Sequence, residues 1–183
     1  MDDEAFRVLW NDLHALPLSQ QTTLVLRKTT LALSLSGSRY PVLNLILDQS
    51  TMYPTPNLLF CFPNLEVLVA CDSSVADSLP RLDWLPGSVR HVHILQSNFE
   101  DLQEEPAPTA TFPALESLTF TWLQPDAGES GNPAADVANP LLDLRKFVES
   151  SFVAPQCTFK YLRSTKSSEE ALADAMADLG VGS

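Results

Sequence analysis

The stretch Phe62-Pro63-Asn64-Leu65-Glu66-Val67-Leu68 decides the fold, because the chain repeats its pattern fifty residues later. The second copy is Phe112-Pro113-Ala114-Leu115-Glu116-Ser117-Leu118, and both copies read F-P-x-L-E-x-L. Residues 86–94 form a third copy midway between them, in which three apolar residues keep the spacing of Leu65, Leu68 and Ala70: Val89, Val92 and Ile94. The intermediate copy indicates a period of about 25 residues rather than one long repeat.

Two further copies precede these, one with Val42, Leu45 and Leu47 and one with Leu24 and Leu26. Equivalent positions in successive copies are about 21–26 residues apart, and they are Leu24, Leu45, Leu68, Val92 and Leu118. A sixth copy follows after a longer interval, at Phe159, Tyr161 and Ser164. Within each copy, apolar residues alternate with outward-facing ones, so each copy predicts a short strand with one buried face.

A small hydroxyl residue lies three positions beyond the last core residue of each of the first four strands, and an apolar residue follows two positions later. These pairs are Thr29 and Leu31, Ser50 and Met52, Ser73 and Val75, and Ser97 and Phe99. We expect the buried hydroxyl to hydrogen-bond the backbone of the turn that leaves the strand. The fifth copy has Leu123 at this position and departs from the pattern.

The pattern resembles the irregular, ribonuclease-inhibitor-like leucine-rich-repeat family, whose motif is L-x-x-L-x-L-x-x-N/C-x-L with a period of about 20–29 residues. The resemblance covers residues 20–125, with an extension to residue 165, and this chain has Thr or Ser where the family has Asn. It implies an α/β fold, namely a short irregular solenoid with a parallel sheet of five or six strands and a convex side of loops or 3₁₀ turns. Stacked repeats would share one core, because no single repeat can bury its own apolar face. The alternative is an ordinary α/β domain with evenly spaced strands.

The chain is expected to form one domain over residues 1–183, with a helix covering each end of the repeats. Residues 1–18 are predicted as an N-terminal capping helix and residues 167–183 as a C-terminal helix, either of which could instead dock on a partner. The repeats occupy residues 20–165, with loops at 103–111 and 124–140 and a further helix at 141–151. The predicted apolar face of the C-terminal helix is Ala171, Leu172, Ala175, Met176 and Leu179.

Charge and cysteine usage restrict the partner and the compartment. The chain has 23 acidic and 11 basic residues and a net charge of -12, which repels phosphate and anionic lipid. We therefore expect a protein partner, with a basic surface favoured, and neither direct nucleic-acid nor membrane binding. The acidic start at residues 1–4 and three cysteines without a paired motif predict a cytoplasmic or nuclear protein.

The strand register also defines a candidate contact face, which in this family is the concave strand face. Its outward residues begin with Val25 and end with Thr158 and Lys160. The predicted protein-binding residues are Arg27, Ile46, Asp48, Val67, Val69, His91, His93, Ser117 and Thr119. The middle of this face is apolar, and an exposed apolar patch usually marks a protein interface. Alternatively, a terminal helix or a long loop folds over the patch and hides it.

The sequence contains no nucleophile elbow, phosphate loop or zinc-protease motif. His91 and His93 share the outer face, but a metal site would need a third ligand, and none is evident among the outward residues of the adjacent strands. No cofactor and no metal are therefore predicted, and the expected function is a non-catalytic protein-binding scaffold or adaptor within a larger assembly.

Two other functions stay open at this point. One is a substrate-recognition component of a ubiquitin ligase, because Leu16-Pro17-Leu18 is similar to the opening of an F-box. The residues that follow run directly into the first strand and leave no room for the rest of such a box. The other is a small hydrolase that uses His91 or His93 as a base, with Ser117 or Thr119 as the nucleophile.

Overall fold

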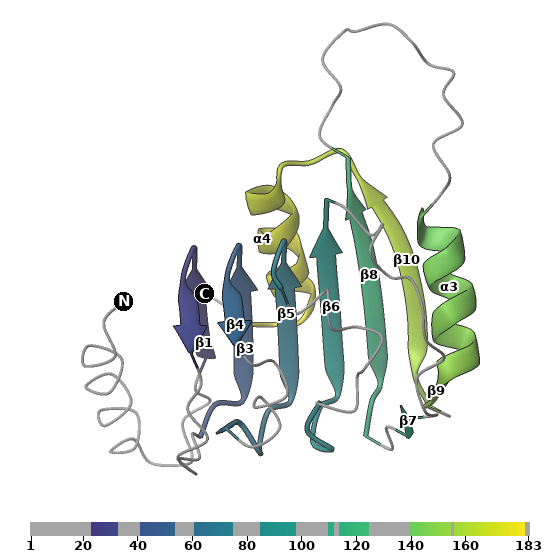
Figure 1. The fold of residues 1–183 in the computed structure, drawn as a ribbon, viewed down its shortest axis with the longest axis horizontal. Helices are drawn as coiled ribbons and strands as arrows, with labels where there is room; N and C mark the ends of the chain where they lie inside the picture. The colour runs from purple at the N-terminus through teal and green to yellow at the C-terminus, as the bar shows by residue number, and fades with distance from the viewer. Residues whose placement is uncertain are drawn as a thin grey trace, which may run out of the picture.

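The structure is a computed structural model that describes residues 23–32, 41–53, 61–74, 85–97, 110–111, 114–124, 140–154 and 156–181. Its largest element is a six-stranded, all-parallel sheet in the order β1-β3-β5-β6-β8-β10, so each strand lies beside the next one along the chain (Figure 1). The strands are β1 (Thr23–Arg27), β3 (Asn44–Asp48), β5 (Val67–Cys71), β6 (His91–Gln96), β8 (Ser117–Leu123) and β10 (Thr158–Ser164). The predicted parallel sheet of five or six strands and the α/β class are confirmed.

The strands pair in the register that the sequence spacing predicts. One continuous row of paired residues crosses the sheet: Leu24, Leu45, Leu68, Val92, Leu118 and Phe159. Because successive side chains of a strand point to opposite faces, each such row belongs to one face of the sheet. The register therefore decides which residues are buried together.

The row of Leu24 and the row of Leu26 point into the main hydrophobic core. The segments that connect the strands complete this core from outside the sheet, with Phe62, Leu65 and Val89 among their buried residues. Helix α3 (Pro140–Ser151) confirms the predicted helix at 141–151, and it adds Leu141, Leu144 and Val148 to the same core. In Figure 1 this helix lies at the β10 end of the sheet.

Each of the first three strands ends in the same tight turn. The residue after the strand has a left-handed backbone, with φ of 47° at Lys28, 49° at Gln49 and 43° at Asp72. This conformation is uncommon for residues other than glycine. Here the N–H of each turn residue donates to a carbonyl of the neighbouring strand, at 2.8 Å from Lys28 to Asp48, 2.8 Å from Gln49 to Cys71 and 2.9 Å from Asp72 to Leu95. The stacking of neighbouring turns holds each turn in this conformation.

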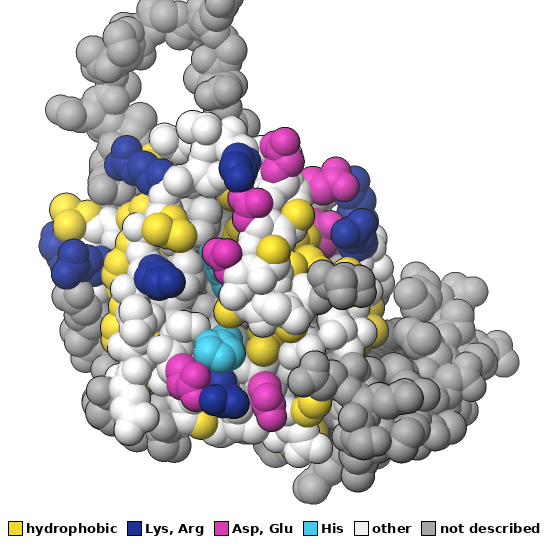
Figure 2. All heavy atoms as spheres, turned by 180° about the vertical axis from the view of Figure 1, so that it is seen from behind, with side chains coloured by type: hydrophobic (Ala, Val, Ile, Leu, Met, Phe, Trp, Pro, Cys, Tyr) yellow, Lys and Arg dark blue, Asp and Glu magenta, His cyan; other side chains and the backbone are white. Residues whose placement is uncertain are grey.

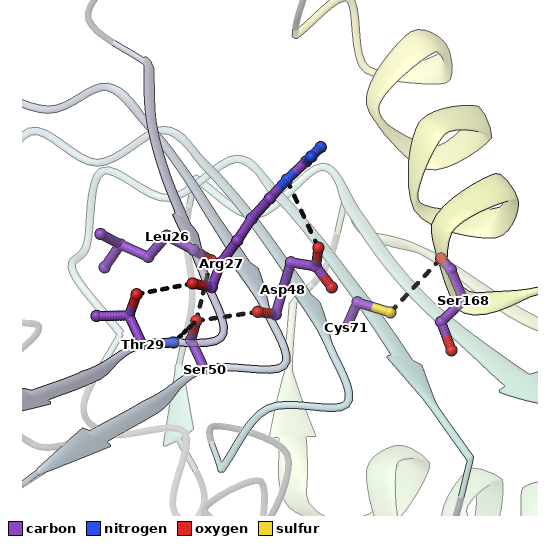
Figure 3. Close-up of polar contacts among 7 residues, drawn as sticks. All are labelled: Leu26, Arg27, Thr29, Asp48, Ser50, Cys71 and Ser168. Atoms are coloured by element: carbon purple, nitrogen blue, oxygen red, sulfur yellow. Dashed lines mark hydrogen bonds and ion pairs between the residues drawn. The ribbon is translucent and has the colours of Figure 1, made fainter.

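The predicted hydroxyl residues hold these turns together (Figure 3). Ser50 Oγ lies 3.0 Å from the carbonyl oxygens of both Leu26 and Asp48, and it accepts the Thr29 N–H at 3.2 Å. Ser73 Oγ donates to the carbonyl of Ser50 at 2.6 Å, so this hydroxyl links its own turn to the preceding one. The predicted role of the hydroxyl is confirmed at Ser50 and Ser73. The prediction is wrong at Ser97, which is exposed and whose hydroxyl donates to the Asp72 carboxylate at 3.0 Å.

The fifth copy lacks a hydroxyl because the strand does not end there. Strand β8 continues through Leu123, which pairs with Ser164 of β10. Leu123 therefore occupies a strand position, and no turn backbone at that position needs a side-chain partner.

Two small parallel sheets complete the described structure. One pairs β2 (Thr30–Ala32) with β4 (Thr51–Tyr53), just after the first two turns, and the other pairs β7 (Ala110–Thr111), which precedes β8, with β9 (Phe152–Val153), which follows α3. The prediction of a loop over 103–111 is wrong at its last two residues, because Ala110–Thr111 pairs as a strand. The remainder of that loop, residues 125–139 of the second loop and the predicted N-terminal helix at 1–18 lie outside the described residues.

Helix α4 (Ser168–Asp178) confirms the predicted C-terminal helix but not its position. It was expected to cover an end of the sheet. Instead it packs on β5 and β6 in the middle, on the face opposite the main core. The reason is the apolar character of that face, described below.

Replacing Ser50 with Ala should lower the free energy of unfolding by about 1–3 kcal/mol, because the backbone groups that its hydroxyl satisfies are left without a side-chain partner. Thr51→Ala is the matched control, since Thr51 is exposed and should change stability by less than about 0.5 kcal/mol. Urea unfolding of both variants measures the difference. Equal stability of the two variants would contradict the role assigned to Ser50.

Candidate protein-binding face

The face of the sheet that carries α4 is formed by three rows of residues, and we term it the α4 face. The first row runs from Thr23 to Thr158, the second from Val25 to Lys160 and the third from Arg27 to Leu162. In full, the rows are Thr23, Asn44, Val67, His91, Ser117 and Thr158; Val25, Ile46, Val69, His93, Thr119 and Lys160; and Arg27, Asp48, Cys71, Leu95, Thr121 and Leu162. All the predicted binding residues lie on this face, so the predicted grouping is correct.

The middle of the α4 face is covered, not open. Ile46 and Val69 are 0% exposed and Val67 is 7% exposed. They form a second hydrophobic core together with residues of α4 and the segment after it, namely Ala171, Leu172, Ala175 and Val181. The expectation of an exposed apolar patch at Ile46, Val67 and Val69 is therefore wrong, and the alternative of a covering terminal helix is the arrangement found. Burying each of these side chains stabilises the fold by about 1.5–3 kcal/mol, which explains why α4 lies over them.

Small residues on α4 let the helix approach the sheet. Ala171 and Ala175 are four positions apart, so they share one helical face with Leu172 and Met176. Ser167 begins the helix with a capping box, in which its hydroxyl accepts the Glu170 N–H and the Glu170 carboxylate accepts the Ser167 N–H. Gly180, with φ of 66°, ends it and turns Val181 back toward the second core.

A polar contact fixes the start of α4 to the turn after β5. The Ser168 hydroxyl donates to Asp72 Oδ2 at 3.0 Å, and the other oxygen of the same carboxylate accepts the Ser97 N–H at 2.7 Å. Cys71 Sγ lies 3.8 Å from the carbonyl of Ser168 (Figure 3). Burial, with a smaller contribution from the Asp72 and Asp48 charges, raises the pKa of the Cys71 thiol to about 12, so this thiol stays protonated.

His93 lies beside α4 and is only 8% exposed. Its Nε2 is 2.8 Å from Thr121 Oγ1. Burial is the main reason that its pKa is lowered to about 4, and the charge of Lys160 lowers it further while that of Asp178 opposes the shift. The imidazole is therefore neutral at neutral pH and acts as a hydrogen-bonding part of the interior.

His91 has a different environment from His93, although both point to the α4 face. Its Nδ1 is 2.9 Å from Ser117 Oγ, its Nε2 is 3.7 Å from Glu116 Oε2, and its side chain is half-buried. Arg90 holds the other oxygen of Glu116 at 2.9 Å and 2.5 Å from two of its guanidinium nitrogens. Figure 2 shows a histidine at the surface of this side of the molecule, beside acidic and basic side chains.

The strand register does not predict the carboxylate beside His91, because Glu116 precedes β8 and is not one of the outward strand residues. The resulting set of serine, imidazole and carboxylate has the components of a hydrolytic triad. Its geometry does not suit that chemistry, since the carboxylate is paired with Arg90 and does not hydrogen-bond the imidazole. Among the described residues, no group of three His, Cys, Asp or Glu side chains is placed to hold a metal ion.

The parts of the α4 face that stay open lie at its two ends. At the β1 end, Val25 is 40% exposed, and the exposed side chain of Arg27 forms an ion pair at 3.6 Å with Asp48, whose own side chain is mostly covered. At the β10 end, Lys160 is exposed and Leu162 is 45% exposed, while the predicted residue Thr119 is buried. Leu162 was missed from the sequence, although the period of two from Thr158 and Lys160 places it on the same face.

Comparison of the chain with models of protein families, with curated proteins and with solved structures finds no match. Among the helices in the described part of the chain, none has the length and apolar character needed to cross a membrane.

The lowered pKa of His93 predicts a pH dependence of stability. The unfolded chain binds a proton at this residue below pH 6.5, whereas the folded chain binds it only near pH 4, so stability is full above pH 6.5 and falls as the pH drops toward 4. Between pH 7 and pH 4 the wild type should lose about 3 kcal/mol more unfolding free energy than His93→Gln. Urea unfolding across this range measures the loss, and parallel curves for the two chains would refute the assignment.

Proposed function

We propose that this chain is a short, irregular leucine-rich-repeat solenoid that serves as a non-catalytic protein-binding scaffold or adaptor in a larger protein assembly. The observation that carries the proposal is the sheet itself, whose six parallel strands follow one another in chain order and in the register of the repeat. Such a sheet arises when successive units stack on their neighbours and share a core. Solenoids of this kind use their extended strand face to bind partners.

The turns give independent support for repeating units. Lys28, Gln49 and Asp72 have the same left-handed conformation at equivalent positions, and Ser50 and Ser73 make related contacts with turn backbone. Hydroxyl residues replace the asparagine of the family motif in this role. A serine has one donor where an asparagine amide has two, yet the three turns keep the same left-handed conformation.

The proposed contact surface consists of the two open ends of the α4 face, with Val25 and Arg27 at one end and Lys160 and Leu162 at the other. His91 on β6 and Ser117 on β8 belong to the first row of the same face and are half-buried. A net charge of -12 disfavours nucleic acid and anionic lipid and, for the chain as a whole, favours a partner with a basic surface, although the exposed charged residues at the two open ends, Arg27 and Lys160, are themselves basic. We propose a cytoplasmic or nuclear location for the assembly.

A small hydrolase is the second candidate, because His91 and Ser117 lie at hydrogen-bonding distance. A screen of ester and peptide substrates with the wild type, His91→Ala and Ser117→Ala tests it. Turnover by the wild type that both variants lose would support the hydrolase and contradict the scaffold. The ligase alternative rests on Leu16-Pro17-Leu18, which lie outside the described residues.

Affinity capture from cells with tagged chains tests the scaffold proposal. The double variant Val25→Asp/Leu162→Asp places charges on two exposed side chains of the α4 face, so it should fold normally and lose most of the partner that the wild type recovers. Leu142→Asp is the matched control, because Leu142 is 52% exposed but belongs to α3 on the other side of the sheet. Equal recovery by the folded double variant would refute this contact surface.

A further inference from the structure

We propose that the covered middle of the α4 face is itself a helix-binding surface, which α4 occupies from within the chain and from which a partner helix of matching chemistry displaces it. The inference rests on the proposed function and names the partner class for the same face. The covered middle comprises Ile46, Val67, Val69, Cys71 and Leu95, all of which contribute to the second core. Four of these side chains are no more than 1% exposed, so the surface fits a helix closely.

The chemistry of α4 defines the partner. The sheet meets a stripe in which alanines at positions 171 and 175 allow close approach and Leu172 supplies the largest fully buried side chain of the helix. At the start of the helix, a hydroxyl reaches Asp72. A partner helix should therefore carry small residues four positions apart, a leucine beside one of them, and Ser or Thr in its first turn.

Lifting α4 leaves the sheet intact. The helix follows β10, the last strand in the described part of the chain, and it contributes no strand pairing. Only three of its side chains are fully buried, and two of those are alanines, which bury little apolar area. A helix with so few buried contacts and no strand pairing opens more easily than the sheet beneath it.

The main core cannot open by the release of one helix. The strands that build it are tied to one another by pairing and by the stacked turns, and its residues come from every strand of the large sheet. Opening this core requires global unfolding, whereas opening the second core requires only the release of α4. The two cores should therefore open at different rates.

The cysteines distinguish the two events. Cys71 is fully buried in the second core, and Cys61 is buried in the main core. Release of α4 uncovers Cys71 alone, and global unfolding uncovers both thiols. In the wild-type chain under native conditions, alkylation followed by peptide mass spectrometry should modify Cys71 at least about tenfold faster than Cys61. Equal rates would mean that helix and sheet open as one unit and would overturn the proposal.

A pair of matched variants tests the binding surface. Ala175 faces the sheet and Ala173 faces solvent on the same helix, so Ala175→Glu should release α4 while Ala173→Glu leaves it docked. The probe is a fluorescent synthetic peptide with the sequence of residues 164–183. It should bind Ala175→Glu at least about tenfold more tightly than it binds the wild type or Ala173→Glu, because α4 competes with it in the last two chains.

A peptide that itself carries Ala175→Glu is the negative control and should not bind. Failure of the unmodified peptide to bind an Ala175→Glu chain in which Cys61 stays protected would overturn the helix-binding surface. That result would leave the scaffold proposal standing, provided that Val25→Asp/Leu162→Asp still loses its partner. A different outcome is that the peptide binds and Val25→Asp/Leu162→Asp still recovers its partner. This outcome would support the helix-binding surface and refute the contact surface proposed at the ends of the face.

Discussion

In-register parallel pairing of the six strands is the constraint on which the rest of the structure depends. Each pair of strands places residues from the same position of successive repeats side by side. An apolar residue that recurs once in every repeat therefore becomes part of a continuous apolar row across the sheet. The same constraint acts on the other face. It gathers Ile46, Val67 and Val69 into a second apolar area, which must also be buried or matched by a partner.

The two faces meet this requirement in different ways. The connecting segments and α3 cover the first face, and they do so between strands, as part of the path of the chain. The second face is covered by α4, which follows the strands and is fixed by the contact between Ser168 and Asp72. One face is therefore closed by the chain connectivity and the other by a single helix. This difference is the physical basis for treating α4 as an occupant of a binding surface.

The sequence was sufficient to predict the six strands of the large sheet, their register and the role of Ser50 and Ser73, because these depend on spacing within one repeat and on the chemistry of one turn. The spacing from Leu45 to Leu68 gives the pairing directly, and Ser50 lies where the turn needs a hydroxyl. The position of α4 could not be predicted this way. Its helical face was evident from Ala171, Leu172 and Ala175, but where that face docks depends on complementarity with residues far away in the sequence.

In the candidate site, too, the features set by strand alternation could be predicted from the sequence and those set by distant contacts could not. Alternation along each strand placed the predicted residues on one face, whereas their exposure depended on α4. His91 and His93 are two positions apart and point the same way, yet one is half-buried and the other is covered. The sequence could not separate them, because the difference comes from the helix lying beside His93 and from Glu116 lying beside His91.

The position of α4 on the middle of the sheet is the central claim, and methyl nuclear Overhauser spectroscopy of the native chain tests it most directly. The structure predicts cross-peaks that join the methyl groups of α4, those of Leu172 and Ala175, to methyl groups of the two strands beneath the helix, which belong to Val69 on β5 and Leu95 on β6. It also predicts that a soluble paramagnetic agent leaves the Val69 methyl signals unbroadened, because Val69 is 0% exposed. Absence of these cross-peaks together with broadened Val69 signals would contradict the account.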